Sequence, residues 1–126
     1  MRGERKYPKA VAPDKVGDYR GFAKSGGGYF YDDVLEYRVW CHSDNGTDFF
    51  HAFATFEDAA KFSDATPEAE EPLVLIRQCE WISEAAPGQF AHERSERIAE
   101  WRVEWLTSRK RAKGSIEKFL QNKSDA

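Results

Sequence analysis

The stretch from Val34 to Thr55 constrains the fold most strongly, because it has the pattern of two β-strands joined by a polar turn. Residues 34–42 alternate in side-chain character, residues 43–48 are turn-forming types, and residues 49–53 resume as an apolar run. Alternation with a period of two is typical of a strand that buries one face. We therefore expect a β-hairpin on which the remaining elements pack.

The first predicted strand presents two different faces, because successive side chains of a strand point to opposite sides. One face is apolar and is the predicted core face; it carries Leu35, Tyr37, Val39 and Cys41. The opposite face mixes charged and aromatic side chains; it carries Val34, Glu36, Arg38, Trp40 and His42. The mixed face fits either one wall of a ligand-binding cleft or a partly covered outer surface.

A helix signal follows the second predicted strand. Thr55 is a residue type that caps free amides at a helix N-terminus, and Glu57 and Asp58 suit the positive end of the helix dipole. Pro67 disfavours helical backbone at the residue before it. We therefore expect a helix from Phe56 to about Ala65.

The second half of the chain predicts three more strands. A near-continuous apolar run opens one at Pro72 that continues towards Ile82, as is typical of a central strand covered on both faces. Residues 85–88 form a predicted turn, and residues 89–93 a short strand. Residues 97–106 alternate again, with two tryptophans on the apolar face, and predict a longer strand.

Together these patterns predict a single α+β domain over residues 1–126. We expect a mixed, mostly antiparallel sheet of about five or six strands, one internal helix and one C-terminal helix. Residues 1–33 form a largely irregular N-terminal segment, and residues 107–126 a basic C-terminal helix and tail. The predicted core consists of Leu35, Tyr37, Val39, Phe53, Phe62, Val74, Ile76, Trp101, Val103 and Trp105.

Charge is distributed unevenly along the chain. Residues 1–24 carry seven Lys/Arg and three Asp/Glu, residues 25–106 six and seventeen, and residues 107–126 six and two. An acidic body does not favour nucleic acid binding, because phosphate contacts need clustered Lys and Arg. The basic ends either touch an anionic partner, fold back on the acidic body or stay solvated.

The chain has neither an apolar run of about 20 residues, which a membrane span needs, nor a signal-peptide pattern. We therefore expect a soluble cytoplasmic protein without a membrane partner.

Cys41 and Cys79 lie in separate predicted strands and have no CxxC spacing. Two buried, reduced thiols are expected, although adjacent strands would permit a disulfide.

Few residues carry an obvious chemical signature. The three histidines, His42, His51 and His92, lie at no metal-ligand spacing, so we expect no metal site. The glycines of residues 26–28 lack the pattern of a phosphate-binding loop and predict a mobile connection. Glu100 belongs to the charged face of the last predicted strand, either as a general base or within a solvated surface.

Two sequence segments, residues 29–42 and residues 53–63, resemble those of a small bacterial family without an assigned biochemical role. The resemblance covers most of residues 7–106. Members of such families are sometimes labelled GNAT-type acetyltransferases, so the resemblance implies acetyl transfer. The chain has no (Q/R)xxGx(G/A) loop, which in that class binds the pyrophosphate of acetyl-CoA.

The order of elements is also similar to that of ADP-ribosyltransferase-like domains. In those domains one strand bears Arg or His, a second ends in a hydroxyl-bearing motif before a helix, and a late strand supplies Glu. Arg38 matches the first role, Thr55 the second, and Glu96 or Glu100 the third. The usual ExE spacing is replaced here by ExxE, at Glu93 and Glu96.

These observations leave three functions open. The first is a domain that binds an anionic or nucleotide-like ligand in a cleft edged by Arg38, Trp40 and His42, since Trp and Arg suit a stacked negative group. The second is a transferase with Arg38, Thr55 and Glu100 as catalytic residues. The third is an interaction module that meets a protein partner through its basic ends and aromatic surface. No motif identifies a cofactor.

Overall fold

The computed structural model describes residues 7–24, 30–107 and 110–124, so the glycine-rich connection at 26–28 lies outside the described residues. The elements are η2 (Pro13–Lys15), β1 (Ala23–Lys24), β2 (Asp33–His42), β3 (Asp48–Phe53), α1 (Phe56–Ala65), β4 (Leu73–Gln78), β5 (Trp81–Ala86), β6 (Gln89–Glu93), β7 (Arg97–Arg102), η3 (Val103–Leu106) and α2 (Ser115–Ser124).

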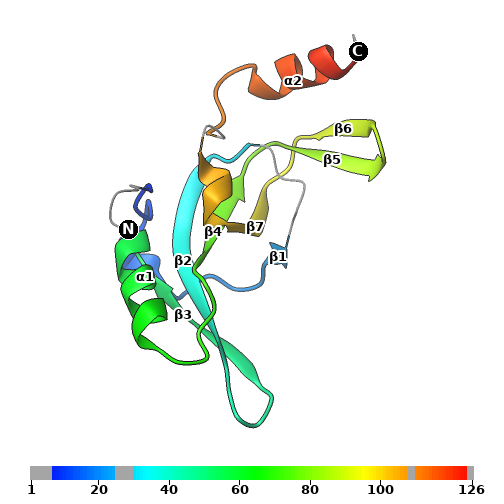
Figure 1. Cartoon of the computed structure of the whole chain (residues 1–126). Coiled ribbons are helices and arrows are strands. Elements are labelled where there is room, and N and C mark those ends of the chain that lie inside the picture. Colours follow the sequence, from blue (N-terminus) through cyan, green and yellow to red (C-terminus); the bar gives the residue numbers. More distant parts are fainter. Residues whose placement is uncertain (1–6, 25–29, 108–109, 125–126) are drawn as a thin grey trace.

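Five strands form one sheet in the order β1–β7–β4–β2–β3, and β5 and β6 form a separate hairpin (Figure 1). The β1–β7 pair is parallel, whereas the other pairs are antiparallel. With α1 between strands and α2 near the C-terminus, this is the predicted α+β fold with a mixed, mostly antiparallel sheet.

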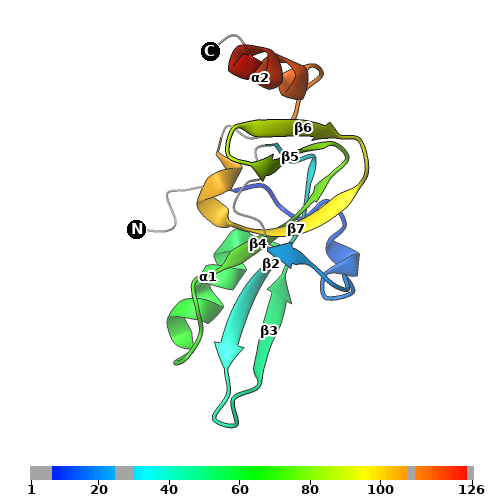
Figure 2. The ribbon, with the colours of Figure 1, turned by 90° about the vertical axis from the view of Figure 1, so that its right-hand side faces the viewer.

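The predicted hairpin is present as β2 and β3, paired from Tyr37↔Phe53 to His42↔Asp48. Its turn lies at one end of the molecule, and α2 with the β5–β6 hairpin lies at the opposite end (Figures 1 and 2). Gly46 in the turn has φ 82°, which glycine adopts without the steric cost that a side chain brings.

A β-bulge near the start of β2 changes which side chains share a face. Val34 pairs with Ile76 and Glu36 with Leu75, so Leu35 is the extra residue between them. Val34 therefore joins the core cluster, whereas Leu35 is buried outside it. The predicted faces are wrong at these two positions, because they assumed unbroken alternation.

β4 is the central strand of the sheet, as its apolar sequence predicts. The side chains of residues 74–76 have no exposed surface, so the strand is covered on both faces. The strand ends at Gln78, and a bend at residues 79–80 separates it from β5. The prediction that it continues towards Ile82 is therefore wrong.

The last predicted strand is correct only as far as Arg102. Beyond it, residues 103–106 form the 3-10 helix η3. Val103 and Leu106 are both buried, which fits the three-residue repeat of a 3-10 turn. The apolar spacing of Val103 and Trp105 matches a strand as well, which is why alternation alone extended the strand too far.

Helix α1 has the predicted bounds and covers the core face of the sheet. The Thr55 Oγ1 accepts a hydrogen bond from the Asp58 amide at 3.2 Å, which is the predicted N-cap. Phe56 and Ala59 are buried against the sheet. The helix ends before Pro67, with extended backbone at Thr66.

The core agrees with most of the predicted residues. Six of them belong to the buried cluster: Tyr37, Val39, Val74, Ile76, Trp101 and Val103. Three more are partly buried and pack against that cluster: Phe53, Phe62 and Trp105. The cluster also contains residues that were not predicted, among them Tyr31 and Leu106.

The two ends of the described chain fold back on the body. The amide of Val11 donates to the carbonyl of Val34 in β2 at 3.0 Å, so the irregular N-terminal segment is attached to the sheet. At the other end, Arg111 lies 2.6 Å from Asp32 and 2.7 Å from Glu80. Of the three predicted states of the basic ends, folding back on acidic residues is the one observed at Arg111.

Candidate functional site

The mixed face of β2 carries a buried cluster of three charged side chains. Glu36, Arg38 and Glu100 are each no more than 1% exposed at their side chains. Arg38 Nε donates to Glu36 Oε2 at 2.7 Å, and Arg38 Nη1 lies 3.7 Å from Glu100 Oε2. The strand register explains why these side chains lie close together. β4 lies between β2 and β7, and its Leu75 pairs with Glu36 on one side and with Glu100 on the other.

Aromatic rings and the N-terminal segment seal this cluster. The Arg38 guanidinium lies 4.1 Å from the Phe50 ring centroid and 5.4 Å from that of Phe22. Arg38 Nη2 donates to the Tyr19 carbonyl at 3.2 Å. Trp40 Nε1 donates to Glu100 Oε2 at 2.9 Å. The charged groups are therefore enclosed rather than open to solvent.

Two atoms of the cluster are buried without a hydrogen-bond partner among the described residues, namely Nη1 of Arg38 and Oε1 of Glu100. The structure thus brings together Arg38, Trp40 and Glu100 from the predicted sets. An anion approaching Arg38 would have to displace both the aromatic cover and two carboxylates. In this conformation the arginine neutralises buried carboxylates.

The other two predicted site residues lie elsewhere. Thr55 follows β3, and its hydroxyl caps α1, the helix that covers the core face. Arg38 and Glu100 lie on the opposite face, so Thr55 does not join them. His42 lies at the far end of β2 and is half exposed, with 49% of its side chain accessible.

His42 is held between two carboxylates. Its Nδ1 lies 2.9 Å from Asp48 Oδ1, and its Nε2 lies 2.5 Å from Glu70 Oε2. Hydrogen bonds to its two partners raise the pKa of His42 above its ordinary value of 6.5, and the bond to Asp48 has a larger effect than the bond to Glu70. The His42 ring therefore links β2, the start of β3 and the segment before β4.

The pH dependence of this link has a defined sign. Because the folded-state pKa of His42 is raised, its contribution to stability is complete below pH 6.5 and is lost as pH rises through the folded value.

We expect NMR titration of the His42 ring to give a midpoint above 6.5. Asp48→Asn should lower that midpoint more than Asp44→Asn, and a wild-type midpoint at or below 6.5 would contradict the two-carboxylate arrangement.

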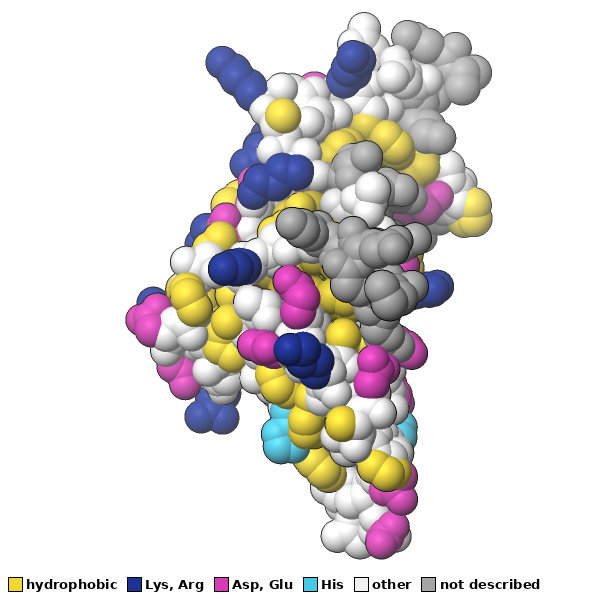
Figure 3. All heavy atoms as spheres, turned by 60° about the vertical axis from the view of Figure 1, so that its left-hand side comes forward, with side chains coloured by type: hydrophobic (Ala, Val, Ile, Leu, Met, Phe, Trp, Pro, Cys, Tyr) yellow, Lys and Arg dark blue, Asp and Glu magenta, His cyan; other side chains and the backbone are white. Residues whose placement is uncertain are grey.

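Next to His42 lies an open pocket of about 310 Å³. It is formed where the β2–β3 hairpin faces the end of α1 and the loop that follows. Its lining consists of Cys41, His42, Ser43, Asp44, Phe49, His51, Phe62, Thr66, Pro67 and Glu68. Hydrophobic and histidine side chains gather over this end of the molecule in Figure 3.

The loop between α1 and β4 is paired with β2 and holds Glu68 in an unusual backbone conformation. The amide of His42 donates to the Glu68 carbonyl at 3.3 Å, and that of Glu70 donates to the Trp40 carbonyl at 2.8 Å. Glu68 has φ 72°, and it is the sole non-glycine residue with positive φ in the described ranges. The left-handed backbone conformation costs a residue with a side chain about 1–2 kcal/mol. Such strain tends to occur at functional sites.

The two cysteines are both free thiols. Cys41 is buried, and burial raises the pKa of its thiol above the ordinary value of 9.0. Cys79 is exposed at the bend after β4, so the prediction that both are buried is wrong for it. The predicted strand continued through Cys79, whereas the chain turns there.

Comparison with known proteins finds no match among family models, curated proteins or solved structures. No helix within residues 7–24, 30–107 and 110–124 is both long and apolar enough to span a bilayer.

Proposed function

We propose that this protein is an interaction module whose pocket beside the β2–β3 hairpin takes a positively charged side chain of a partner protein. The observation that carries the proposal is the lining, which combines aromatic rings with the carboxylates of Asp44 and Glu68 and contains neither Lys nor Arg. The ligand is a lysine or arginine presented by an extended segment of the partner.

The aromatic part of the pocket suits the stem of such a side chain. Phe49 and His51 have ring centroids 5.6 Å apart, and His51 lies 4.8 Å from Phe62. Phe49 is 45% exposed, which is unusual for a residue of its size. A lysine or arginine stem buries apolar surface against such rings, and its charged head gains from their faces.

Charge in the pocket has the sign that a basic ligand needs. Asp44 and Glu68 line it, and His42 is already neutralised by Asp48 and Glu70. Residues 25–106, which form most of the surroundings, carry seventeen Asp/Glu against six Lys/Arg. This surplus steers a cationic segment towards the pocket.

The edge of the sheet offers a way to present that side chain. β3 is the terminal strand in the sheet order, and two of its residues, Phe49 and His51, line the pocket. An extended segment that adds to such an edge makes main-chain hydrogen bonds, and its alternate side chains enter pockets on one face. A basic side chain that points from such a segment into the pocket would reach its carboxylates.

A binding assay tests the proposal with a short extended peptide that carries one central lysine. We expect the peptide to bind at low salt, and acetylation of the lysine to weaken binding about 10–100-fold, since a charged hydrogen bond contributes roughly 1.5–3 kcal/mol. Equal binding of the acetylated peptide, measured by fluorescence anisotropy, would overturn the proposal.

A substitution at Glu68 separates loss of function from loss of folding. Glu68→Gly removes the carboxylate but relieves the positive φ, so the free energy of unfolding should rise by about 0.5–1 kcal/mol while peptide affinity falls. Glu57→Gln is the matched control, because Glu57 is exposed on the first turn of α1 and does not line the pocket. Undiminished affinity in the Glu68→Gly variant would contradict the assigned role of its carboxylate.

A further inference from the structure

A second cluster lies at the opposite end of the molecule, where three separate elements converge. Glu80 comes from the bend between β4 and β5, His92 from β6 and Glu117 from α2. One ligand atom from each of these residues lies within 4.8 Å of the other two. From this convergence we propose that Glu80, His92 and Glu117 bind a zinc ion that fastens α2 to the β5–β6 hairpin.

The donor set suits zinc. One imidazole nitrogen and two carboxylate oxygens make a three-protein-ligand set, with water as the fourth ligand of a tetrahedral site. His92 Nε2 lies 2.8 Å from Glu80 Oε1, so two of the donors already face one another. The His92 side chain is 9% exposed and that of Glu80 is 27% exposed, which limits how far either can turn away.

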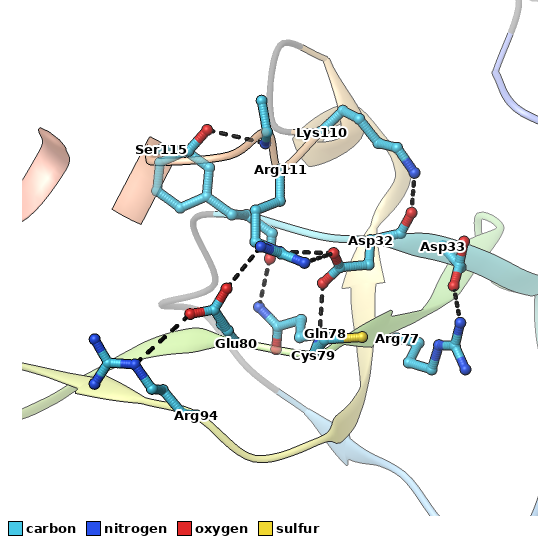
Figure 4. Close-up of polar contacts among 12 residues, drawn as sticks. Asp32, Asp33, Arg77, Gln78, Cys79, Glu80, Arg94, Lys110, Arg111 and Ser115 are labelled. Atoms are coloured by element: carbon cyan, nitrogen blue, oxygen red, sulfur yellow. Dashed lines mark hydrogen bonds and ion pairs between the residues drawn. The ribbon is translucent and has the colours of Figure 1, made fainter. Parts of the chain in front are cut away.

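Groups around the cluster hold Glu80 in the orientation that the metal requires. Its Oε2 accepts a hydrogen bond from Arg111 Nη1 at 2.7 Å, which leaves Oε1 turned towards His92. Arg111 is in turn fixed by Asp32 at 2.6 Å (Figure 4). Hydrogen bonds of this kind to ligating carboxylates orient metal ligands in known sites.

The charge balance determines how strongly a dication can bind. Arg111 lies against Glu80, and Arg94 approaches it at 4.0 Å, so two guanidinium groups oppose the ion (Figure 4). Glu80, Glu117 and Asp32 contribute three carboxylates. The resulting surplus of one negative charge favours a dication. The imidazole donor and the small number of protein ligands suit zinc better than calcium, which takes six to eight oxygen ligands.

The site would give α2 an anchor that its packing supplies only in part. Ile116 is buried, and the Phe119 ring contacts that of Phe90 at a centroid distance of 5.7 Å. Glu117 itself is exposed on the same helix. A metal bond between Glu117 and the hairpin would therefore join the C-terminal helix to the body.

Calorimetric titration of the full chain with Zn²⁺ tests this inference. We expect one ion per chain, and a rise in Tm on the order of 10 °C when free Zn²⁺ is a hundred times its Kd. His92→Ala and Glu117→Gln should each weaken zinc binding by about a hundredfold or more. This is above the range of roughly 10–100-fold seen when a group that hydrogen-bonds a metal ligand is removed. Glu117 is exposed, so its variant is expected to fold even if the His92 variant does not.

Other possible zinc ligands provide the controls. His42→Ala removes the exposed histidine at the opposite end, and Cys79→Ser removes the exposed thiol beside Glu80. Both variants should keep the wild-type Kd, and ¹⁵N chemical shifts should report metal on His92 Nε2. Zinc binding that is lost with either control, or that is unchanged in both the His92 and Glu117 variants, would overturn the assignment.

Discussion

Replacing Arg38 by alanine is expected to lower the free energy of unfolding by about 3–5 kcal/mol, the range for removing one partner of a buried ion pair. Arg38 is 1% exposed at its side chain and faces two buried carboxylates, Glu36 and Glu100. Without the guanidinium, both acids would remain buried with no cation beside them. Urea denaturation of the purified variant measures the effect.

Arg102→Ala is the matched control for this prediction. Arg102 is also an arginine with a carboxylate partner, Glu104 at 3.2 Å, but its side chain is 66% exposed. Exposed pairs of this kind contribute about 0–1 kcal/mol, so the control should be nearly neutral. The triple change Arg38→Met, Glu36→Gln and Glu100→Gln should recover part of the loss. Equal stabilities of the Arg38 and Arg102 variants would contradict the enclosed cluster.

Trp101→Ala is expected to destabilise the fold by a similar amount, about 3–5 kcal/mol, because it leaves a large cavity in the core. Trp101 is 1% exposed, and its ring lies 6.1 Å from each of the Tyr31 and Trp105 centroids. Thermal and urea unfolding should both show the loss.

The neighbouring tryptophan provides the comparison. Trp105 is only partly buried at the margin of the core cluster, so Trp105→Ala should cost less than Trp101→Ala. Residues 103–106 form a 3-10 helix instead of continuing β7, which turns Trp105 towards the edge of the core. Equal losses in the two variants would contradict the marginal position of Trp105, and a nearly neutral Trp101→Ala would contradict the burial of Trp101.

Local signals explain which parts of the fold could be predicted from the sequence. The hairpin turn, the Thr55 cap and the stop at Pro67 act through neighbouring residues, and the bounds of α1 follow from them. The bulge at Leu35 and the end of β7 depend on partner strands and tertiary packing. Alternation within one strand cannot reveal such changes of phase.

The candidate sites depended on contacts between distant segments. The pairing of Arg38 with an acid on the last strand was predictable, because both lie on charged faces of their strands. Its enclosure was not, because the cover includes the irregular segment around Tyr19 and Phe22. The pocket was also missed, because it forms only where the β2–β3 hairpin meets the end of α1 and the loop that follows. His42 and the acidic body were the sequence signals that pointed towards it.

The most direct test of ligand binding is an NMR titration of ¹⁵N-labelled protein with the single-lysine peptide. We expect the largest amide shifts at Phe49, His51 and Glu68, which line the pocket, and none at Arg38 in its enclosed cluster. Shifts centred on Arg38 and Glu100 would contradict the proposed pocket and return the function to the charged face of β2.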